Sequence, residues 1–297
     1  MDDMTVLKRK AGADMVLILI LVLLVLYIVW QRWELSRFGV TSYEVRSPKL
    51  RRSASAAVIA DLHGFSYGKE NKRLLEQVKN MEPQVIFIPG DLLVSKYADT
   101  YDRALETLKE LIKIAPVYYS YGNHESRLRD PERINHPLFL QYLKQAEALG
   151  VQIMETESRE ISLGENQVML SALELELDYY EKGGIPPMEA AYMQQHLKLQ
   201  REELFQILLA HNPAYAESYA KWGADVTFCG HNHGGLIRIP GIGSLISPQL
   251  TLFPKYDAGK FQIGNRCVIV SRGLGTHTFH VRIFNRAELL EINFLPE

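Results

Sequence analysis

The chain has 297 residues and a formal net charge of -2, with 47% hydrophobic and 23% charged residues. This composition fits an ordinary folded domain with a sizeable core. The near-neutral charge argues against a broad nucleic-acid-binding surface, which is usually strongly basic, but not against a small nucleotide as substrate. The two cysteines, Cys229 and Cys267, lie in separate apolar runs. We therefore expect two buried thiols rather than a disulfide.

The first element in chain order is an apolar segment that follows a short basic tail, residues 1–14. A membrane-spanning helix needs about 20 residues, with roughly 17 as the lower limit. Residues 15–31 meet that limit if the flanking residues lie in the membrane interface. Tyr27, Trp30 and Trp33 occupy the positions expected of an interfacial aromatic belt. The segment is thus a predicted transmembrane anchor.

Two other interpretations of this segment are weaker. A core helix would carry a polar stripe, and the run from Met15 to Trp30 has none. A cleaved signal peptide fits the basic residues 8–10, but no small-x-small cleavage site follows the run. We expect a single-pass membrane protein. Basic residues on the two sides nearly balance, so the sequence does not decide which side carries the catalytic domain.

Beyond the anchor, residues 32–52 are polar and basic and are predicted to form a juxtamembrane linker, and residues 53–297 one domain. Short apolar runs rich in β-branched residues indicate buried strands. The predicted strands are 56–60, 85–88, 117–120, 206–210, 225–229, 267–271 and 289–294. Helical periodicity marks residues 71–80, 100–114, 137–149 and 188–203. Residues 151–154 and 168–171 alternate in polarity, which suggests an antiparallel part.

This alternation of strands and helices predicts an α/β fold in which helices cover the sheets. A metal-capable side chain follows directly after each of five predicted strands. They are Asp61 with His63, Asp91, Asn123 with His124, His211, and His231 with His233. Because the carboxyl ends of strands in such a sheet converge on one crevice, we expect these side chains to meet in space.

The residue types favour a transition-metal site. Carboxylate, amide and imidazole donors together suit Mn, Fe, Zn or Co better than Mg or Ca. Neighbouring glycines such as Gly90, Gly122 and Gly230 permit a tight backbone path and the close approach of an anion. Each motif alone has an ordinary explanation, since Gly-Asp after a strand is usually a turn. The five motifs in one order, each at a strand end, favour a metal pair.

The ordered motifs D-x-H at 61–63, G-D at 90–91, G-N-H-E at 122–125, histidine 211 and G-H-x-H at 230–233 resemble those of the calcineurin-like metallophosphoesterases. The resemblance runs from about Ala56 to the C-terminus. Less specifically, residues 207–213, 230–235 and 271–275 resemble the bacterial membrane-anchored branch of that superfamily. The resemblance implies a four-layer α/β/β/α sandwich with two divalent metal ions, preceded here by the transmembrane helix.

The resemblance also implies a division of the ligands between the two ions. One ion would take Asp61, His63, Asp91 and His233, and the other Asp91, Asn123, His211 and His231. Asp91 would then bridge two ions that share a hydroxide, and this hydroxide would attack the phosphoryl group in line. His124 would protonate the leaving oxygen. Its alternative role is only to orient an aspartate or the phosphate.

Two departures from the family pattern affect finer features. Val94 stands where many relatives have a second aspartate, so the tuning of the centre differs. Residues 172–180 replace a Gly-Val-Asp-Asp-like turn, and they either line a substrate-specific lip or form an exposed strand end. Arg272 is expected to contact either a substrate phosphate or an internal carboxylate. His277 and His280 are candidates for the rim of the site.

These features predict a membrane-anchored, metal-dependent hydrolase of a phosphomonoester, a phosphodiester or a pyrophosphate. A narrower hypothesis is a pyrophosphatase for a lipid-linked or nucleotide-linked sugar diphosphate, since the anchor would hold the site near such substrates. The non-enzymatic alternative is a membrane-tethered binding protein that keeps the fold. A nuclease is disfavoured by the charge. The substrate, the metals and the oligomeric state are not determined by the sequence.

Overall fold

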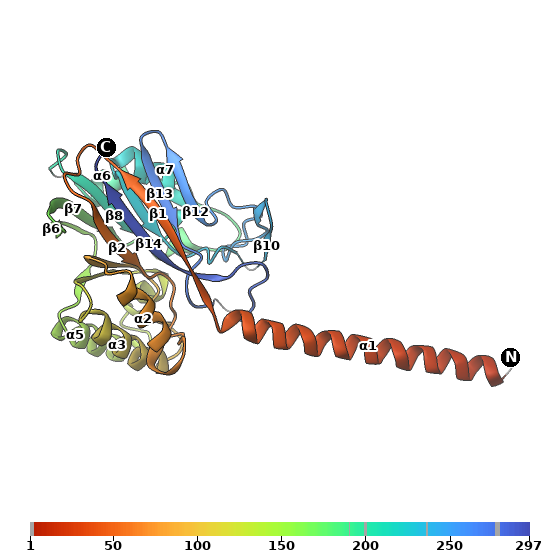
Figure 1. Cartoon of the computed structure of the whole chain (residues 1–297). Helices are drawn as coiled ribbons and strands as arrows, with labels where there is room; N and C mark the ends of the chain where they lie inside the picture. The colour runs from red at the N-terminus through yellow and green to blue at the C-terminus, as the bar shows by residue number, and fades with distance from the viewer. Residues whose placement is uncertain (1–2, 190, 199–200, 236, 277–279) are drawn as a thin grey trace.

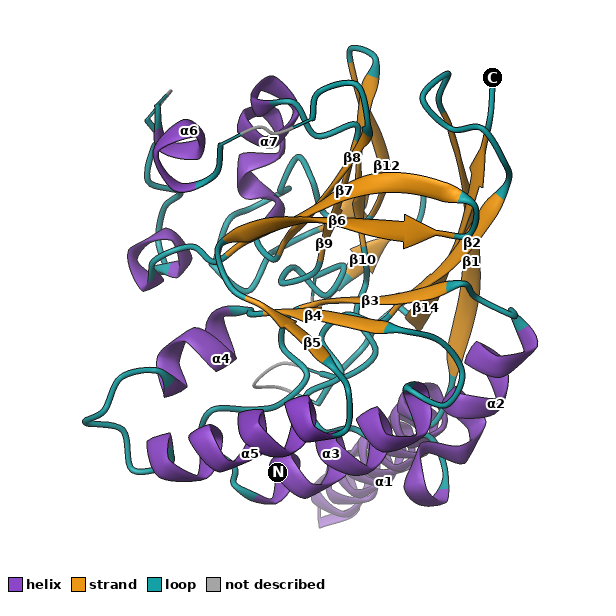
Figure 2. Ribbon diagram, turned by 90° about the vertical axis from the view of Figure 1, so that its left-hand side faces the viewer, coloured by secondary structure: helices purple, strands orange, loops and turns teal. Residues whose placement is uncertain are grey.

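The chain folds into an N-terminal helix and a domain built on two six-stranded β-sheets with helices packed against them (Figures 1 and 2). The computed structural model describes residues 3–189, 191–198, 201–235, 237–276 and 280–297. Helix α1 (Asp3–Leu35) projects away from the domain that the sheets form (Figure 1). The cysteines predicted to be free are free, and both are buried.

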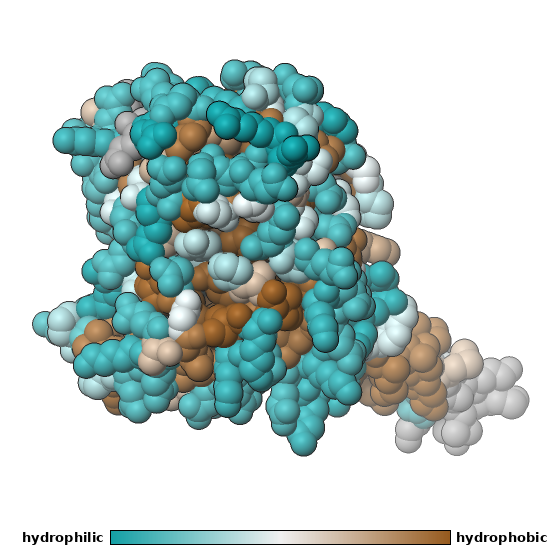
Figure 3. Space-filling view, turned by 60° about the vertical axis from the view of Figure 1, so that its left-hand side comes forward, coloured by the Kyte–Doolittle hydropathy of each residue, from teal (hydrophilic) through white to brown (hydrophobic). Residues whose placement is uncertain are grey.

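The apolar segment of α1 is long enough to cross a membrane by length and composition. Its candidate span, Asp14–Leu35, has 22 residues and a mean hydropathy of 2.5. At 1.5 Å per residue it extends about 33 Å, compared with a hydrocarbon core of about 30 Å. The large apolar side chains between Met15 and Val29 are exposed, and they form an apolar projection outside the domain (Figure 3).

The first sheet has the strand order β1-β14-β2-β3-β4-β5. Its strands are β1 (Phe38–Arg46), β2 (Ala54–Val58), β3 (Val85–Pro89), β4 (Val117–Ser120), β5 (Gln152–Met154) and β14 (Ala287–Leu295). All neighbouring pairs are parallel except β14 with β2. Strands β2, β3 and β4 therefore end at the same edge of the sheet.

The second sheet has the order β12-β13-β9-β8-β7-β6. Its strands are β6 (Glu157–Leu163), β7 (Asn166–Leu173), β8 (Phe205–Ala210), β9 (Val226–Cys229), β12 (Gly259–Ile263) and β13 (Arg266–Val270). The central strands β7, β8, β9 and β13 are parallel, and antiparallel strands close both edges. A small hairpin, β10 (Arg238–Ile239) with β11 (Gly243–Ser244), lies outside both sheets.

Three hydrophobic clusters separate four layers. One lies between the first sheet and the helices α2 (Lys72–Asn80), α3 (Asp99–Leu111) and α5 (His136–Ala148). A second fills the space between the two sheets. The third lies between the second sheet and the helices α6 (Tyr192–His196) and α7 (Ala216–Trp222). This is the four-layer α/β/β/α sandwich that the sequence predicts, and Figure 2 shows helices outside both sheets.

The structure differs from the prediction for residues 32–52. These residues were expected to form a linker, but α1 continues to Leu35 and nine of the following residues form β1. Every residue of β1 is paired with β14, from Phe38 with Ala287 to Arg46 with Leu295. Because the partner strand lies at the other end of the chain, no local pattern reveals this pairing.

Two further elements were predicted wrongly. Among the described residues of 188–203, the expected helix is confined to α6, and Leu197 is already in an extended conformation. Tyr192 and Met193 are buried in the third cluster, so packing rather than periodicity fixes this short helix. Residues 151–154 were expected in an antiparallel part, but β5 pairs parallel with β4. The antiparallel part is the β6–β7 hairpin.

Phe228 provides a test of the packing between the sheets. Its ring stacks on Phe87 of the first sheet, with ring centroids 5.7 Å apart, and it is fully buried. We expect Phe228→Ala to destabilise the domain by about 3–5 kcal/mol, because truncation leaves a cavity between two rigid sheets. Thermal unfolding in detergent measures the effect, with Phe253→Ala, at an exposed ring, as control. Equal melting temperatures for the two variants would contradict this description of the core.

Candidate metal centre

The loops that follow five strands converge at one point between the two sheets. From the first sheet, Asp61 and His63 follow β2, Asp91 follows β3, and Asn123 begins the short helix α4 (Asn123–Leu128) after β4. From the second sheet, His211 follows β8, and His231 and His233 follow β9. All seven predicted ligands are buried. The structure thus brings together the whole set that the sequence proposed.

One group of donor atoms lies around His63. The Nε2 atoms of His63 and His233 are 3.1 Å apart, and Asp61 Oδ1 lies 3.7 Å from His233 Nε2. Two donors each about 2.0–2.1 Å from the same ion are separated by about 3 Å at ordinary coordination angles. Asp61, His63 and His233 could therefore hold one metal ion. These residues match the ligands expected for the first ion.

A second group lies around His211 and His231. The Nδ1 atom of His231 is 2.9 Å from Oδ1 of Asn123, and the Nε2 atom of His211 is 3.1 Å from Oδ2 of Asp91. Asp61, Asp91 and His211 also form a cluster close enough to bind an ion. This cluster contains two of the residues expected for the second ion, Asp91 and His211, together with Asp61, which was expected for the first.

Asp91 lies between the two groups. Its Oδ2 atom is 3.1 Å from His211 Nε2 and 3.8 Å from His63 Nε2. Its Oδ1 atom accepts the backbone N–H of His124 at 2.8 Å. Burial raises the pKa of Asp91, but His211 and His124 outweigh burial and hold the pKa well below its usual value. A carboxylate that stays ionised between two imidazole groups is suited to bridge two cations.

Backbone carbonyls orient two of the imidazole rings. The Nδ1 atom of His211 lies 2.7 Å from the carbonyl oxygen of Pro89, and that of His63 lies 3.3 Å from the carbonyl oxygen of Leu93. Because a carbonyl only accepts, each Nδ1 carries the proton and donates it. Nε2 is then the nitrogen that faces the centre, and loss of its proton gives the lone pair that a histidine metal ligand requires.

His124 has the opposite tautomer. Its Nδ1 accepts the backbone N–H of Ser95 at 3.0 Å, so in the neutral ring the proton is on Nε2. The ring lies edge-on to His63, with centroids 4.9 Å apart. His124 also forms a cluster with His63 and Asp91. The neutral His124 ring therefore carries its proton on Nε2, since Nδ1 accepts from Ser95.

The ligand-bearing loops hold strained backbone. Asp61, His63, Asp91, His231 and His233 all have φ between 48° and 67°. Such left-handed conformations cost of order 1–3 kcal/mol each in residues other than glycine, and they cluster at functional sites. These conformations turn successive side chains toward the centre directly after a strand.

Two positions in the site require glycine, because a Cβ atom at either one would collide with a neighbouring carboxylate. A Cβ atom on Gly230 would lie 2.6 Å from Oδ2 of Asp61, and one on Gly122 would collide with the Asp91 carboxylate. Neither glycine has a positive φ. The sequence suggested that these glycines admit an anion. In the structure they admit the ligand carboxylates themselves.

Sequence reasoning assigned no role to Glu125, although it stands within the G-N-H-E motif. This buried carboxylate accepts the backbone N–H groups of Asp91 at 2.9 Å, Leu92 at 2.9 Å and Gly122 at 3.0 Å. It also accepts the hydroxyl of Tyr119 at 2.6 Å. Burial, with Asp91 nearby, raises the pKa of Glu125 to about 7. Glu125 thus ties the Asp91 loop to the loop that begins α4.

Tyr180 adds an aromatic wall to the centre. Its buried ring lies 5.0 Å from the ring of His231 and 6.1 Å from that of His211. Tyr180 is the last residue of the stretch 172–180, which was predicted to form either a substrate-specific edge of the site or an exposed strand end. Leu175 and Tyr180 are buried, while Glu176 and Asp178 are exposed. The stretch therefore reaches the metal-binding loops through its last aromatic residue.

Comparison with known proteins identifies the family to which the chain belongs. The family model described as calcineurin-like phosphoesterase matches residues 54–235. The chain belongs to this family. It is 26% identical over 195 residues to phosphodiesterase YaeI of Escherichia coli, which covers 66% of this chain and 64% of that protein. The match thus spans just under two thirds of that relative's length.

The chain is also similar to the uncharacterized protein YpbG of Bacillus subtilis. The two are 26% identical over 231 residues, which cover 76% of this chain and 74% of YpbG. Among solved structures, the phosphopantetheinyl hydrolase PptH of Mycobacterium tuberculosis is similar with a TM-score of 0.45 and 14% identity. That similarity covers 73% of this chain and 88% of the other.

The calcineurin-like phosphoesterase family is dimetal-dependent, and the donor atoms of this member fit two ions. Two groups of nitrogen and oxygen donors lie on either side of one shared carboxylate. The imidazole nitrogens of His63 and His211 already face the centre because carbonyls hold the opposite nitrogen. The donor types and their separations are thus compatible with metal binding at this cluster.

Two of the three remaining candidates, Arg272 and His280, lie within the described residues and contact side chains other than the predicted ligands. Arg272 Nε is 3.6 Å from Oε2 of Glu288, so the arginine pairs with an internal carboxylate, one of its two expected partners. The Nδ1 atom of His280 is 2.5 Å from the hydroxyl of Thr276. His277 lies outside the described residues.

Glu125 provides a test of how the centre is held together. We expect Glu125→Gln to weaken metal binding roughly 10- to 100-fold, because the amide gives up one acceptor and turns an NH₂ group toward backbone donors. Calorimetric titration of the metal-free chain with Mn²⁺ measures the change. Glu132→Gln, at an exposed position, is the matched control. Unchanged affinity in Glu125→Gln would mean that the carboxylate does not position Asp91.

Proposed function

We propose that this chain is a membrane-anchored phosphoesterase that uses two divalent metal ions to hydrolyse a phosphomonoester, a phosphodiester or a pyrophosphate. The observation that carries the proposal is the position of Asp91 between two groups of donors, each of which combines residues from both sheets. Membership of the calcineurin-like phosphoesterase family supports the reaction class. The donor types suit Mn, Fe, Zn or Co.

When bound, two metal ions supply a nucleophilic water at neutral pH and a positive clamp for the phosphoryl oxygens. Asp61, His63 and His233 would hold one ion, and Asn123, His211 and His231 the other. Asp91 would serve both. The chain contributes a buried, preorganised set of ligands whose rings are already oriented by backbone carbonyls.

His124 is the proposed general acid. The leaving oxygen of a phosphoester needs a proton as its bond to phosphorus breaks. The Ser95 N–H fixes the proton of the neutral ring on Nε2, and the ring lies beside His63 at the edge of the centre. The ring could therefore donate this proton to the leaving oxygen of a phosphoester bound at the centre.

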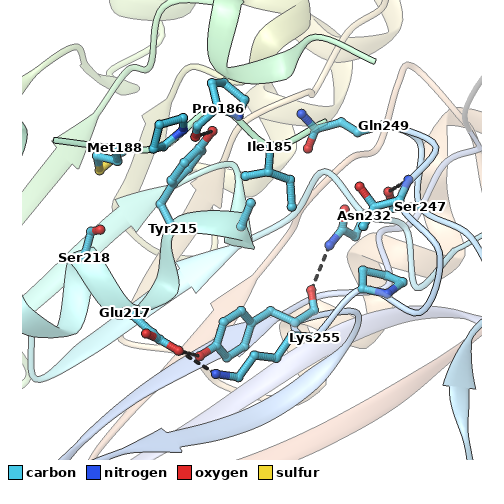
Figure 4. A pocket seen from close by; sticks show the side chains of 15 residues that line it. Ile185, Pro186, Met188, Tyr215, Glu217, Ser218, Asn232, Ser247, Gln249 and Lys255 are labelled. Carbon is cyan, nitrogen blue, oxygen red and sulfur yellow. Dashed lines mark hydrogen bonds and ion pairs between the residues drawn. The ribbon is translucent and has the colours of Figure 1, made fainter. Parts of the chain in front are cut away.

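A cavity beside the centre is the proposed site for the group esterified to the phosphate. It has a volume of about 370 Å³ and is lined partly by Asn232, which stands between His231 and His233 (Figure 4). The Asn232 amide donates to the carbonyl of Tyr256. Lys255 at its edge pairs with Glu217. Its lining combines apolar side chains such as Ile185 and Met188 with polar ones such as Gln249 and Thr251. Such a mixed lining suits an organic substituent that carries polar groups.

The membrane part of the proposal rests on α1. The 22-residue span Asp14–Leu35 has a mean hydropathy of 2.5, and its large apolar side chains between Met15 and Val29 are exposed. So large an exposed apolar surface is unfavourable in water and marks a contact with a membrane or a partner. An anchor of this kind would hold the site close to substrates carried by the membrane. A lipid-linked or nucleotide-linked diphosphate is therefore the narrower hypothesis. The side of the membrane on which the domain lies is left open by this argument.

Hydrolysis of bis-p-nitrophenyl phosphate by the detergent-solubilised chain with Mn²⁺ tests the enzymatic proposal. We expect two bound ions per chain and a loss of activity of at least about 10³-fold in Asp91→Asn, because both ions lose a ligand. Retained activity in Asp91→Asn, or no turnover with any divalent ion, would contradict the proposal.

The role of His124 needs a separate variant. We expect His124→Gln to bind both ions but to lose roughly 10²- to 10⁴-fold in kcat for a substrate with a poor leaving group. The loss should be much smaller for a p-nitrophenyl ester, because that leaving group needs no proton. A role limited to orienting Asp91 predicts equal losses for the two substrates.

A further inference from the structure

The segment 237–253, together with Ile283 and Phe284, forms a small layer of paired backbone that we call the loop layer. Ile237 bridges Ile283, and Leu245 donates its N–H to the carbonyl of Ile237. Phe253 in turn donates to the carbonyl of Leu245. The β10–β11 hairpin is part of this layer. These loops therefore behave as one connected surface.

The outer face of the loop layer is unusually apolar. Five of its large apolar side chains are each more than half exposed: Ile242, Leu250, Leu252, Phe253 and Phe284. On the inner face of the same segment, Ser247, Gln249 and Thr251 line the cavity of Figure 4. Such a reversal, with polar residues inside and large apolar residues outside, marks a surface that contacts something other than water.

The loop layer adjoins the membrane-facing helix directly. The rings of Phe284 and Trp30 of α1 have centroids 6.4 Å apart. One residue further along, the Gln31 side chain donates to the carbonyl of Arg282 and accepts its N–H, both at 3.1 Å. This end of α1 is therefore fixed to the loop layer. The apolar surface of the helix continues onto Phe284.

The arrangement of the strands places the loop layer on the side of the domain from which α1 extends. Strand β1 begins at Phe38, three residues after α1 ends, beside Ala287. At this same end of the sheet, Leu290 pairs with Val58, the last residue of β2 before Asp61. The helix therefore enters the domain at the end that carries the metal ligands. Figure 1 shows the β10 hairpin projecting toward the side on which α1 extends.

We propose that the outer face of the loop layer docks onto the lipid bilayer beside α1, with Leu252, Phe253 and Phe284 in its interfacial region. This proposal rests on the membrane anchoring proposed above. It names a second membrane contact, in addition to the helix. Two contacts fix the tilt of the domain, whereas a single helix followed by a mobile tether would not.

Charge at the junction fits the headgroup region. A cavity of about 570 Å³ lies between the end of α1 and the domain, lined by Trp30, Phe284 and several charged side chains. Its arginines are Arg37, Arg272 and Arg286, and its acids are Glu34 and Glu288. The arginines exceed the acids by one, which suits a layer of phosphates next to interfacial aromatic rings.

Docking has a consequence for the reaction. The loop segment that would contact lipid also forms one wall of the cavity beside Asn232. The cavity and the metal centre would then lie at the level of the lipid headgroups. A phosphoester carried by a membrane lipid could be reached there without being extracted from the bilayer.

Depth-dependent quenching in phosphatidylcholine vesicles tests the proposal on the full chain. One added cysteine per variant, at Leu252, Phe284, Val22 or Glu165, carries a nitrobenzoxadiazole label. The two native cysteines are buried and so react little. Val22 lies within α1, and Glu165 lies in the turn between β6 and β7, at the end of the second sheet opposite the ligands. Hydrolysis of bis-p-nitrophenyl phosphate confirms that each variant is folded.

We expect spin-labelled lipids to quench the labels at Leu252→Cys, Phe284→Cys and Val22→Cys, and to leave Glu165→Cys unquenched. If Val22→Cys is quenched but Leu252→Cys and Phe284→Cys behave like Glu165→Cys, docking is refuted while anchoring stands. If Val22→Cys is also unquenched, the anchoring itself fails. A label at Leu252→Cys with blue-shifted emission and no quenching would mean that another copy of the chain covers the surface, which also overturns docking.

Discussion

The site depends on one carboxylate, Asp91, held at the point where two sheets meet. Its Oδ2 atom lies within 4 Å of imidazole nitrogens from both sheets, His63 and His211. Its Oδ1 and its backbone N–H are held by His124 and Glu125. A shared carboxylate fixes the separation of the two donor groups. The surrounding loops hold the Asp91 carboxylate in position.

Holding it there is costly for the fold. The seven predicted ligands and Glu125 are buried near the carboxyl ends of strands, and five of the predicted ligands adopt left-handed backbone. Buried charges and strained dihedrals each cost free energy. The four-layer packing offsets this cost, since three hydrophobic clusters surround the strands that carry the ligands. Metal binding would offset more, because the ions neutralise the carboxylates that packing alone leaves close together.

The sequence predicted the parts of the molecule that local patterns encode. Buried strands such as Val85–Pro89 are continuous apolar runs, and the ligands follow them directly, so the set of seven could be assembled before any contact was known. Long-range pairing left no such signal. The partner of β1 is about 250 residues away, and the contact of Gln31 with Arg282 depends on the same pairing. Glu125 was visible in a motif, but its bonds to backbone N–H groups could not be read from residue type.

The central claim is that two metal ions share Asp91. Electron paramagnetic resonance of the full chain loaded with two equivalents of Mn²⁺ tests it most directly, because ions about 3.5–4 Å apart with a common carboxylate are magnetically coupled. The account predicts an exchange-coupled spectrum at two equivalents. A spectrum of two magnetically isolated ions at full occupancy would contradict it, even if the chain proved to be an active phosphoesterase.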